Sequence, residues 1–115
     1  MIVKAVRARI APIEARDADI AKLLRIAAAK LSLQLAEAAP LDGRARAHAM
    51  RIARGTALDV EAALRLALQH DLISPIEMLP LLDDLAELRR TLWRESRYWP
   101  GQPPPVGGYP PPAGG

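Results

Sequence analysis

The stretch "RARAHAMRIARGTALDVEAALRLALQH", residues 44–70, decides the fold because it predicts one long helix. Alanine, leucine and arginine, which all favour helix, make up most of it. Small and apolar side chains recur every three or four residues and predict its inward face. They are Ala49, Ile52, Ala53, Thr56, Val60, Ala63, Leu64 and Ala67. At 1.5 Å per residue such a helix is roughly 40 Å long, so it needs long partner helices to cover it.

Gly55 stands in the middle of this helix, where glycine costs about 1 kcal/mol relative to alanine. A missing side chain allows another helix backbone to come close. We therefore expect Gly55 and its neighbour Thr56 to be close-packing positions, either inside the bundle or between subunits. Replacing Gly55 by leucine is then expected to weaken folding or assembly.

A second helix is predicted before this stretch, after Pro12, which suits a first helical position. Its apolar stripe consists of Ile20, Leu23, Leu24, Ala27, Leu31 and Leu35. Ile26 and Leu33 form a second apolar line on another side. The helix is expected to end near Pro40 and Gly43, which both break helices.

A third helix is predicted to begin at "SPIE", residues 74–77, where Ser74 and Glu77 fit a capping box. Pro80 removes a backbone hydrogen bond and is expected to bend the first turns. The apolar stripe of this helix is Met78, Leu81, Leu82, Leu85, Leu88 and Leu92. Its acidic residues come first and its arginines later, an order that the helix dipole favours.

Ile2, Val6, Ile10 and Ile13 share one helical face and predict a short first helix. The alternation of apolar residues and arginines there also fits a strand, but the sequence offers no partner strand. We therefore expect an all-α fold over residues 1–99, an antiparallel up-down four-helix bundle with a shortened first helix. Seven prolines and five glycines among residues 100–115 predict a disordered Pro/Gly-rich C-terminal tail.

Few side chains suit catalysis or metal binding. There is no cysteine, and the only histidines, His48 and His70, lack a metal-ligand spacing. No serine has a neighbouring base, and no glycine-rich phosphate loop is present. We therefore expect a protein that is not an enzyme and that holds no cofactor and no metal. The N-terminus does not fit a secretion signal and no window approaches the roughly 18 apolar residues of a membrane span, so we expect a cytoplasmic protein.

Basic side chains concentrate in the first half of the sequence. Residues 1–54 hold eleven Lys or Arg against five Asp or Glu, a net charge of +6, whereas residues 55–99 carry a net −3. Eight side chains from two consecutive helices are candidate nucleic-acid contacts: Lys22, Arg25, Lys30, Arg44, Arg46, His48, Arg51 and Arg54. No aromatic residues alternate with them, so contacts to phosphates rather than to bases are expected. The alternative is a solvated surface with internal ion pairs.

The predicted helices carry apolar side chains on more than one side. A stripe about 100° wide is enough to cover one core. Two of the helices exceed that width, so we expect the chain to bury its additional apolar surface against other copies of itself. Trp93 and Trp99 are expected to close the end of the bundle.

Residues 50–74, "MRIARGTALDVEAALRLALQHDLIS", resemble a pattern of the four-helix-bundle proteins encoded in intervening sequences of bacterial 23S rRNA genes. The matching residues are Ile52, Ala53, Gly55, Thr56, Asp59, Glu61, Leu64, Ala67, Leu72, Ile73 and Ser74. Weaker similarity extends the resemblance to roughly residues 10–95, with Gln34 and Ala38 in place of the family's usual Asn and Gly. Family members have a longer N-terminal segment, so the first helix is expected to be shortened, by the choice of start codon or by the fold itself.

The resemblance implies a bundle that assembles into homopentamers. It also implies a relation to the accessory variability proteins of diversity-generating retroelements, which are basic pentamers that bind nucleic acid and a reverse transcriptase. We therefore expect a non-enzymatic oligomeric scaffold whose basic surface binds RNA or DNA. The alternative is a protein-interaction adaptor, in which the bundle surface and the proline runs around Tyr109 recruit a protein partner.

Overall fold

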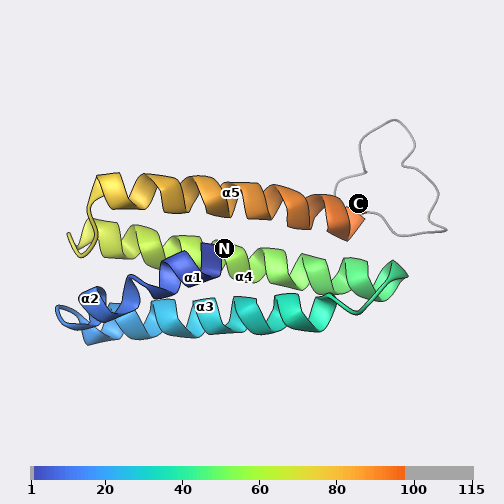
Figure 1. Ribbon diagram of the computed structural model, residues 1–115, viewed down its shortest axis with the longest axis horizontal. Helices are drawn as coiled ribbons and strands as arrows, with labels where there is room; N and C mark the ends of the chain where they lie inside the picture. The colour runs from blue at the N-terminus through green and yellow to red at the C-terminus, as the bar shows by residue number, and fades with distance from the viewer. Residues whose placement is uncertain (1, 98–115) are drawn as a thin grey trace.

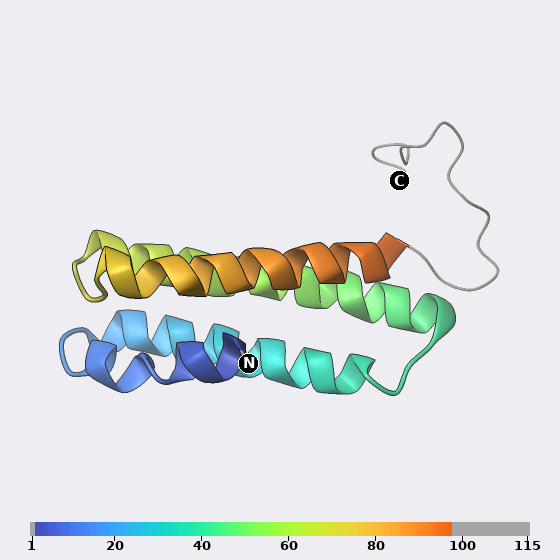
Figure 2. The ribbon, with the colours of Figure 1, turned by 45° about the horizontal axis from the view of Figure 1, so that its top comes forward.

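The computed structural model describes residues 2–97, and every regular element in that range is a helix (Figure 1). The elements are α1 (Ile2–Arg7), α2 (Ile10–Glu14), α3 (Ala18–Ala38), α4 (Gly43–Gln69) and α5 (Pro75–Arg97). The three long helices lie side by side, and α1 and α2 together form the short fourth member (Figure 2). The predicted all-α antiparallel bundle is therefore confirmed. The predicted tail and Trp99 lie outside the described residues.

The middle long helix, α4, packs against α3 on one side and against α5 on the other. α1 contacts both α3 and α5, and α2 contacts α3, so the short pair closes the fourth side of the bundle. α1 and α2 lie beside the half of α3 that holds its N-terminus (Figure 2). α1 and α2 together span fewer residues than α3, α4 or α5.

Leucine, isoleucine, valine and alanine fill the core, which runs through all five helices. All four residues that predicted the first helix are buried: Ile2, Val6, Ile10 and Ile13. α4 contributes many alanines to the core, among them Ala53, Ala57 and Ala67, which have no exposed surface. Small side chains at these positions let α4 pack closely between its two long neighbours.

The predicted inward faces are confirmed in their centres and wrong at two edge positions. Ile52 is 46% exposed and Leu23 is 52% exposed, although each was expected to face the core. Their sequence neighbours Ala53 and Leu24 are fully buried and take the inward positions instead. Each of the two exposed residues lies about 100° around the helix from its buried neighbour, which places it at the edge of the apolar face.

The long helix α3 begins at Ala18, so its predicted start after Pro12 is wrong. The reason is the side chain of Asp17, whose Oδ1 accepts hydrogen bonds from the backbone N–H groups of Asp19 and Ile20, both at 3.0 Å. This N-cap satisfies two donors that a helix start leaves without partners. Pro12 lies in the separate short helix α2.

The predicted capping box at the start of α5 is confirmed. Ser74 Oγ accepts a hydrogen bond from the N–H of Glu77, and Glu77 Oε1 accepts one from the N–H of Ser74, both at 3.2 Å. α5 then continues through Pro80, whose side chain is exposed. Proline at this position removes one hydrogen bond near the N-terminus but does not end the helix.

Candidate nucleic-acid interface

Arg44, His48 and Arg51 lie four and three residues apart on α4, so their side chains share one edge of the helix. Together with Ala47 they line a groove of about 310 Å³, here called the α4 groove. Arg51 also donates a hydrogen bond of 3.2 Å to the carbonyl of Ser96 near the end of α5. The structure therefore brings together three of the eight predicted contacts.

Arg46 has a structural use instead. Its Nε lies 2.9 Å from Glu95 Oε1 on α5, and its Nη1 donates to the carbonyls of Ala38 and Ala39 at 3.3 and 3.4 Å. These bonds hold the end of α3 and the second half of α5 against the start of α4. Arg46 therefore uses Nε and Nη1 for contacts inside the bundle and lines neither the α4 groove nor the groove between α4 and α5.

The three predicted contacts on α3 do not join the groove on α4. Arg25 forms an ion pair of 2.9 Å with Glu14 and ties α3 to α2. Lys22 and Lys30 are exposed on α3, and neither lines the α4 groove or the larger groove described next. The expected positive strip across two consecutive helices is therefore not formed as one site.

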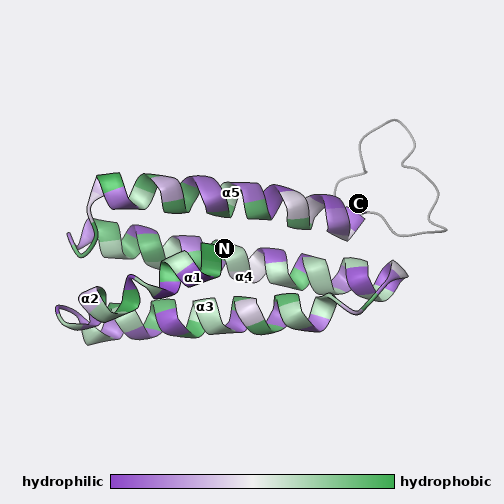
Figure 3. Ribbon diagram, in the orientation of Figure 1, coloured by the Kyte–Doolittle hydropathy of each residue, from purple (hydrophilic) through white to green (hydrophobic). Residues whose placement is uncertain are grey.

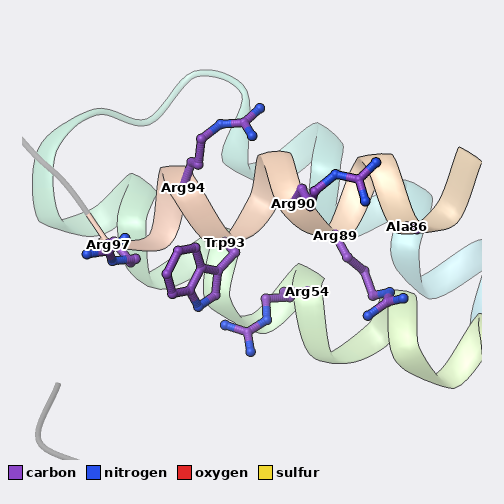
Figure 4. Close-up of a pocket in the computed structure, with 7 residues that line it drawn as sticks. All are labelled: Arg54, Ala86, Arg89, Arg90, Trp93, Arg94 and Arg97. Atoms are coloured by element: carbon purple, nitrogen blue, oxygen red, sulfur yellow. The ribbon is translucent and has the colours of Figure 1, made fainter. Parts of the chain in front are cut away.

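A second, larger groove lies between α4 and α5 (Figure 4). It measures about 610 Å³ and is lined by Arg54, Ala86, Arg89, Arg90, Trp93, Arg94 and Arg97. We call it the arginine groove. Arg54 comes from α4 and is the only one of the eight predicted contacts in this groove; the other lining residues come from α5. They lie in its second half, where hydrophilic residues predominate (Figure 3).

The sequence does not single out this groove, because residues 55–99, which contain most of its arginines, carry a net negative charge. The signal is a spacing: Arg90, Trp93 and Arg97 follow one another at three and four residues on α5, and Arg94 lies beside them. The expectation that Trp93 closes the end of the bundle stays a prediction. Trp93 is 36% exposed and lines the arginine groove. The buried leucines of α5 lie on the side of the helix that faces the core, and Trp93 lies on another side.

Two carboxylates lie beside the five arginines of this groove. Arg89 Nη2 lies 3.0 Å from Oε1 of Glu61, whose other oxygen lies 3.1 Å from Arg65 Nε as the sequence spacing predicts. Arg90 Nη2 donates to Glu87 Oε1 at 2.6 Å, and this hydrogen bond lowers the pKa of Glu87 below its ordinary value. Five positive side chains against two negative ones leave an excess of three positive charges.

Arg94 and Arg97 have no carboxylate partner among the described ion pairs. Arg94 Nη2 donates to the hydroxyl of Thr91 at 3.3 Å. The guanidinium of Arg97 lies over the ring of Trp93, 4.2 Å from the ring centroid. The Glu87 carboxylate interacts with Arg94 through its charge as well as with Arg90. An anion at the groove is attracted to both Arg94 and Arg97.

Gly55 does not mark a close approach between helices of this chain. A Cβ placed on Gly55 has no atom within 4 Å, so the expected close packing inside the bundle is wrong at this residue. Gly55 lies on the exposed side of α4. Thr56 is buried, and its hydroxyl donates to the carbonyl of Ile52 at 3.4 Å, one turn earlier in the same helix. Close packing at Gly55 between subunits stays a prediction.

Three apolar side chains share an exposed face of α3. Leu23, Ile26 and Leu33 are 52%, 54% and 59% exposed, and their spacing of three and seven residues places them on one side of the helix. We call this the outer face of α3. The predicted second apolar line of this helix, Ile26 and Leu33, is confirmed as lying away from the core.

Residues 2–97 offer neither the grouping of a metal site nor the helix of a membrane span. No three His, Asp or Glu side chains there are grouped so that they can hold a metal ion. None of the described helices combines the length and the apolar character that crossing a membrane requires.

Comparisons with known proteins add no relative to this picture. No protein family, no curated protein and no solved structure matches the chain. The resemblance to the 23S rRNA intervening-sequence proteins therefore rests on the sequence pattern of residues 50–74 and stays a prediction.

Proposed function

We propose that this protein is a non-enzymatic helical-bundle scaffold that self-associates and binds RNA or DNA through its phosphates. The observation that carries the binding part is the arginine groove, where five guanidinium groups face two carboxylates. A guanidinium presents several N–H donors in a planar fork that matches two phosphate oxygens. Such a groove suits a polyanion better than it suits an uncharged ligand.

The α4 groove extends this basic surface along the bundle. Arg51 lines the α4 groove and Arg54 lines the arginine groove, three residues apart on one helix. From Arg44 to Arg54 the positive side chains of α4 cover about 15 Å at 1.5 Å per residue. A nucleic acid strand has more than one phosphate within such a length, so several contacts form at once.

The test is the affinity for an RNA and a DNA oligonucleotide measured against salt concentration. We expect log affinity to fall linearly with log salt, because each neutralised phosphate releases counterions. Arg54→Gln combined with Arg94→Gln is expected to reduce the slope by about two, since each phosphate contact contributes roughly one. Lys4→Gln combined with Arg7→Gln removes two exposed charges that are not candidate contacts and serves as the control. A flat salt dependence of the unaltered protein would contradict the proposal.

The outer face of α3 supports the self-association part. Leu23, Ile26 and Leu33 expose more than half of their surface, and Ile52 on the adjacent helix α4 is also exposed. Several exposed apolar side chains on one helix face are a feature of interfaces between proteins. Ile26→Ser combined with Leu33→Ser is expected to give a folded monomer, because neither side chain contributes to the core. Sedimentation analysis gives the number of copies, for which the resemblance implies five, and a monomeric unaltered protein would contradict this part.

A second candidate function is a protein-interaction adaptor that uses the proline-rich residues 100–115. The observation that favours it is the sequence of that segment, in which Tyr109 stands between proline runs. Such runs adopt the polyproline conformation that several recognition domains bind. Deletion of residues 100–115 separates the two functions. Nucleic-acid affinity is expected to survive the deletion, whereas recruitment of a protein partner is expected to fail.

A further inference from the structure

The arginine groove contains an exposed aromatic ring as well as positive charge, and this combination selects among nucleic acids. We infer that the groove binds a single strand of RNA or DNA, with Trp93 stacking on one base and the surrounding arginines contacting the neighbouring phosphates. This inference rests on the proposed function and names the form of nucleic acid that the site takes.

Trp93 is unusual for this chain. The sequence has no phenylalanine and only two tryptophans and two tyrosines, and leucine and alanine fill the core without help from Trp93. The indole of Trp93 is instead part of a groove wall and remains 36% exposed. A large aromatic side chain that is left outside the core is available for contact with a planar ligand.

Arg97 already uses the ring in this way. Its guanidinium lies 4.2 Å from the ring centroid, which is the geometry of a cation–π contact. A nucleobase is planar as well and stacks on the same kind of surface. When a base takes this place, the Arg97 side chain moves to an adjacent phosphate, so the pair supplies both a stacking surface and a positive charge.

The remaining arginines surround the ring. On α5, Arg90 precedes Trp93 by three residues and Arg97 follows it by four, and such neighbours on a helix lie about 5–6 Å apart at their Cβ atoms. Trp93 and Arg54 extend into one side of the groove from α5 and α4, whereas Arg90 and Arg94 extend from the other edge of α5 (Figure 4). Guanidinium groups therefore lie along both edges of α5 near Trp93, where the phosphates before and after a stacked base pass.

A duplex does not use this arrangement. Its bases are stacked on one another, and inserting Trp93 between them requires unstacking. A single strand offers base faces and phosphates together, and stacking on an aromatic side chain tolerates any base. An acidic peptide pairs with the arginines but has no general need for the ring, so the contribution of Trp93 separates these ligands.

The experiment uses the full chain with Trp99→Phe, so that Trp93 is the only tryptophan. Its fluorescence is titrated with oligo(dT), with oligo(rU) and with a DNA duplex of equal length at one salt concentration. We expect saturable quenching and tighter binding by the single strands than by the duplex. The comparison of oligo(dT) with oligo(rU) shows whether the sugar is distinguished.

Trp93→Leu is expected to weaken single-strand binding about tenfold and to leave duplex affinity unchanged, because stacking on one base is lost. Trp93→Phe keeps an aromatic ring and is expected to restore most of the affinity. Both variants are measured in the Trp99→Phe chain with labelled oligonucleotides, and circular dichroism checks that the helices remain. Equal affinities of Trp93→Leu and the parent for oligo(dT), with the salt dependence intact, would overturn this inference and leave the proposed function standing. Absence of any salt-dependent binding would overturn the proposed function itself.

Discussion

Arg89 on α5 lies 3.0 Å from Glu61 on α4, measured between Nη2 and Oε1, and the pair joins the two helices at the edge of the arginine groove. The Glu61 side chain is only 15% exposed, less than any other carboxylate in the described ion pairs. Its second oxygen contacts Arg65. One carboxylate therefore holds two arginines and limits the positive charge of the groove.

Glu61→Gln is expected to change stability and binding in opposite directions. The free energy of unfolding should fall by about 1 kcal/mol, because a partly shielded ion pair between helices is lost. Affinity for oligo(dT) should rise, because Arg89 no longer has a carboxylate beside it. Urea denaturation and the oligonucleotide titration measure the two effects. Asp59→Asn removes an exposed charge two residues away and is the control. A folded Glu61→Gln protein that binds oligo(dT) less tightly would contradict the role assigned to the groove.

Substitutions at Gly55 test whether the exposed side of α4 contacts another subunit. No atom of the chain lies within 4 Å of an added Cβ there, and the position is exposed. In an isolated chain Gly55→Ala should therefore raise the free energy of unfolding by about 1 kcal/mol through helix propensity alone. Ala62→Gly, at another exposed position of α4, should lower it by a similar amount. Urea denaturation under dilute conditions measures both.

Assembly gives the second readout for the same position. If Gly55 lies between subunits, Gly55→Leu should weaken self-association in sedimentation experiments although the helix itself is stabilised. An unchanged association constant for Gly55→Leu would remove Gly55 from the proposed subunit interface. Gly55 would then not be a close-packing position at all, since no part of the same chain packs closely against it.

The sequence predicts the three long helices well because residues close to each helix end determine where it lies. Gly43 begins α4, and the capping box of Ser74 and Glu77 precedes α5. Each signal acts within a few residues, so no knowledge of the packing is needed. The start of α3 shows the limit: Asp17 and Pro12 both suit a helix start, and only the structure shows that Asp17 caps the long helix.

The site is less predictable because it depends on contacts between helices. Arg46 and Arg51 have the same residue type and lie five positions apart, yet Arg46 pairs with Glu95 whereas Arg51 lines a groove. The orientation of α5 about its axis brings Glu95 to Arg46 and Trp93 to the same groove as Arg54. This orientation follows from the packing of the whole core, which a periodic pattern in one helix does not specify.

The capping box of α5 predicts a pH dependence of stability. The pKa of Glu77 is lowered, mainly by the hydrogen bonds from the backbone and the hydroxyl of Ser74, with a smaller contribution from Arg9, 2.7 Å away. Because the pKa is lowered in the folded state, the charged carboxylate stabilises the fold when the pH is above the ordinary pKa of 4.5. This contribution disappears as the pH falls through the folded-state pKa. Glu77→Gln should therefore flatten part of the loss of stability below pH 4.5. Glu37→Gln, an exposed carboxylate of α3, is the control for urea denaturation at several pH values.

The short helices α1 and α2 depend on packing against the rest of the bundle. Helices of six and five residues, the lengths of α1 and α2, do not persist alone in water, so they hold their shape by packing on the bundle. Ile13 of α2 is 1% exposed and is among the largest fully buried side chains, whereas Ile76 in the first turn of α5 is 83% exposed. Ile13→Ala should lower the free energy of unfolding by about 2–5 kcal/mol, and Ile76→Ala should change it by less than about 0.5 kcal/mol. Equal effects of the two substitutions in urea denaturation would mean that α1 and α2 do not hold the fourth side of the bundle in solution.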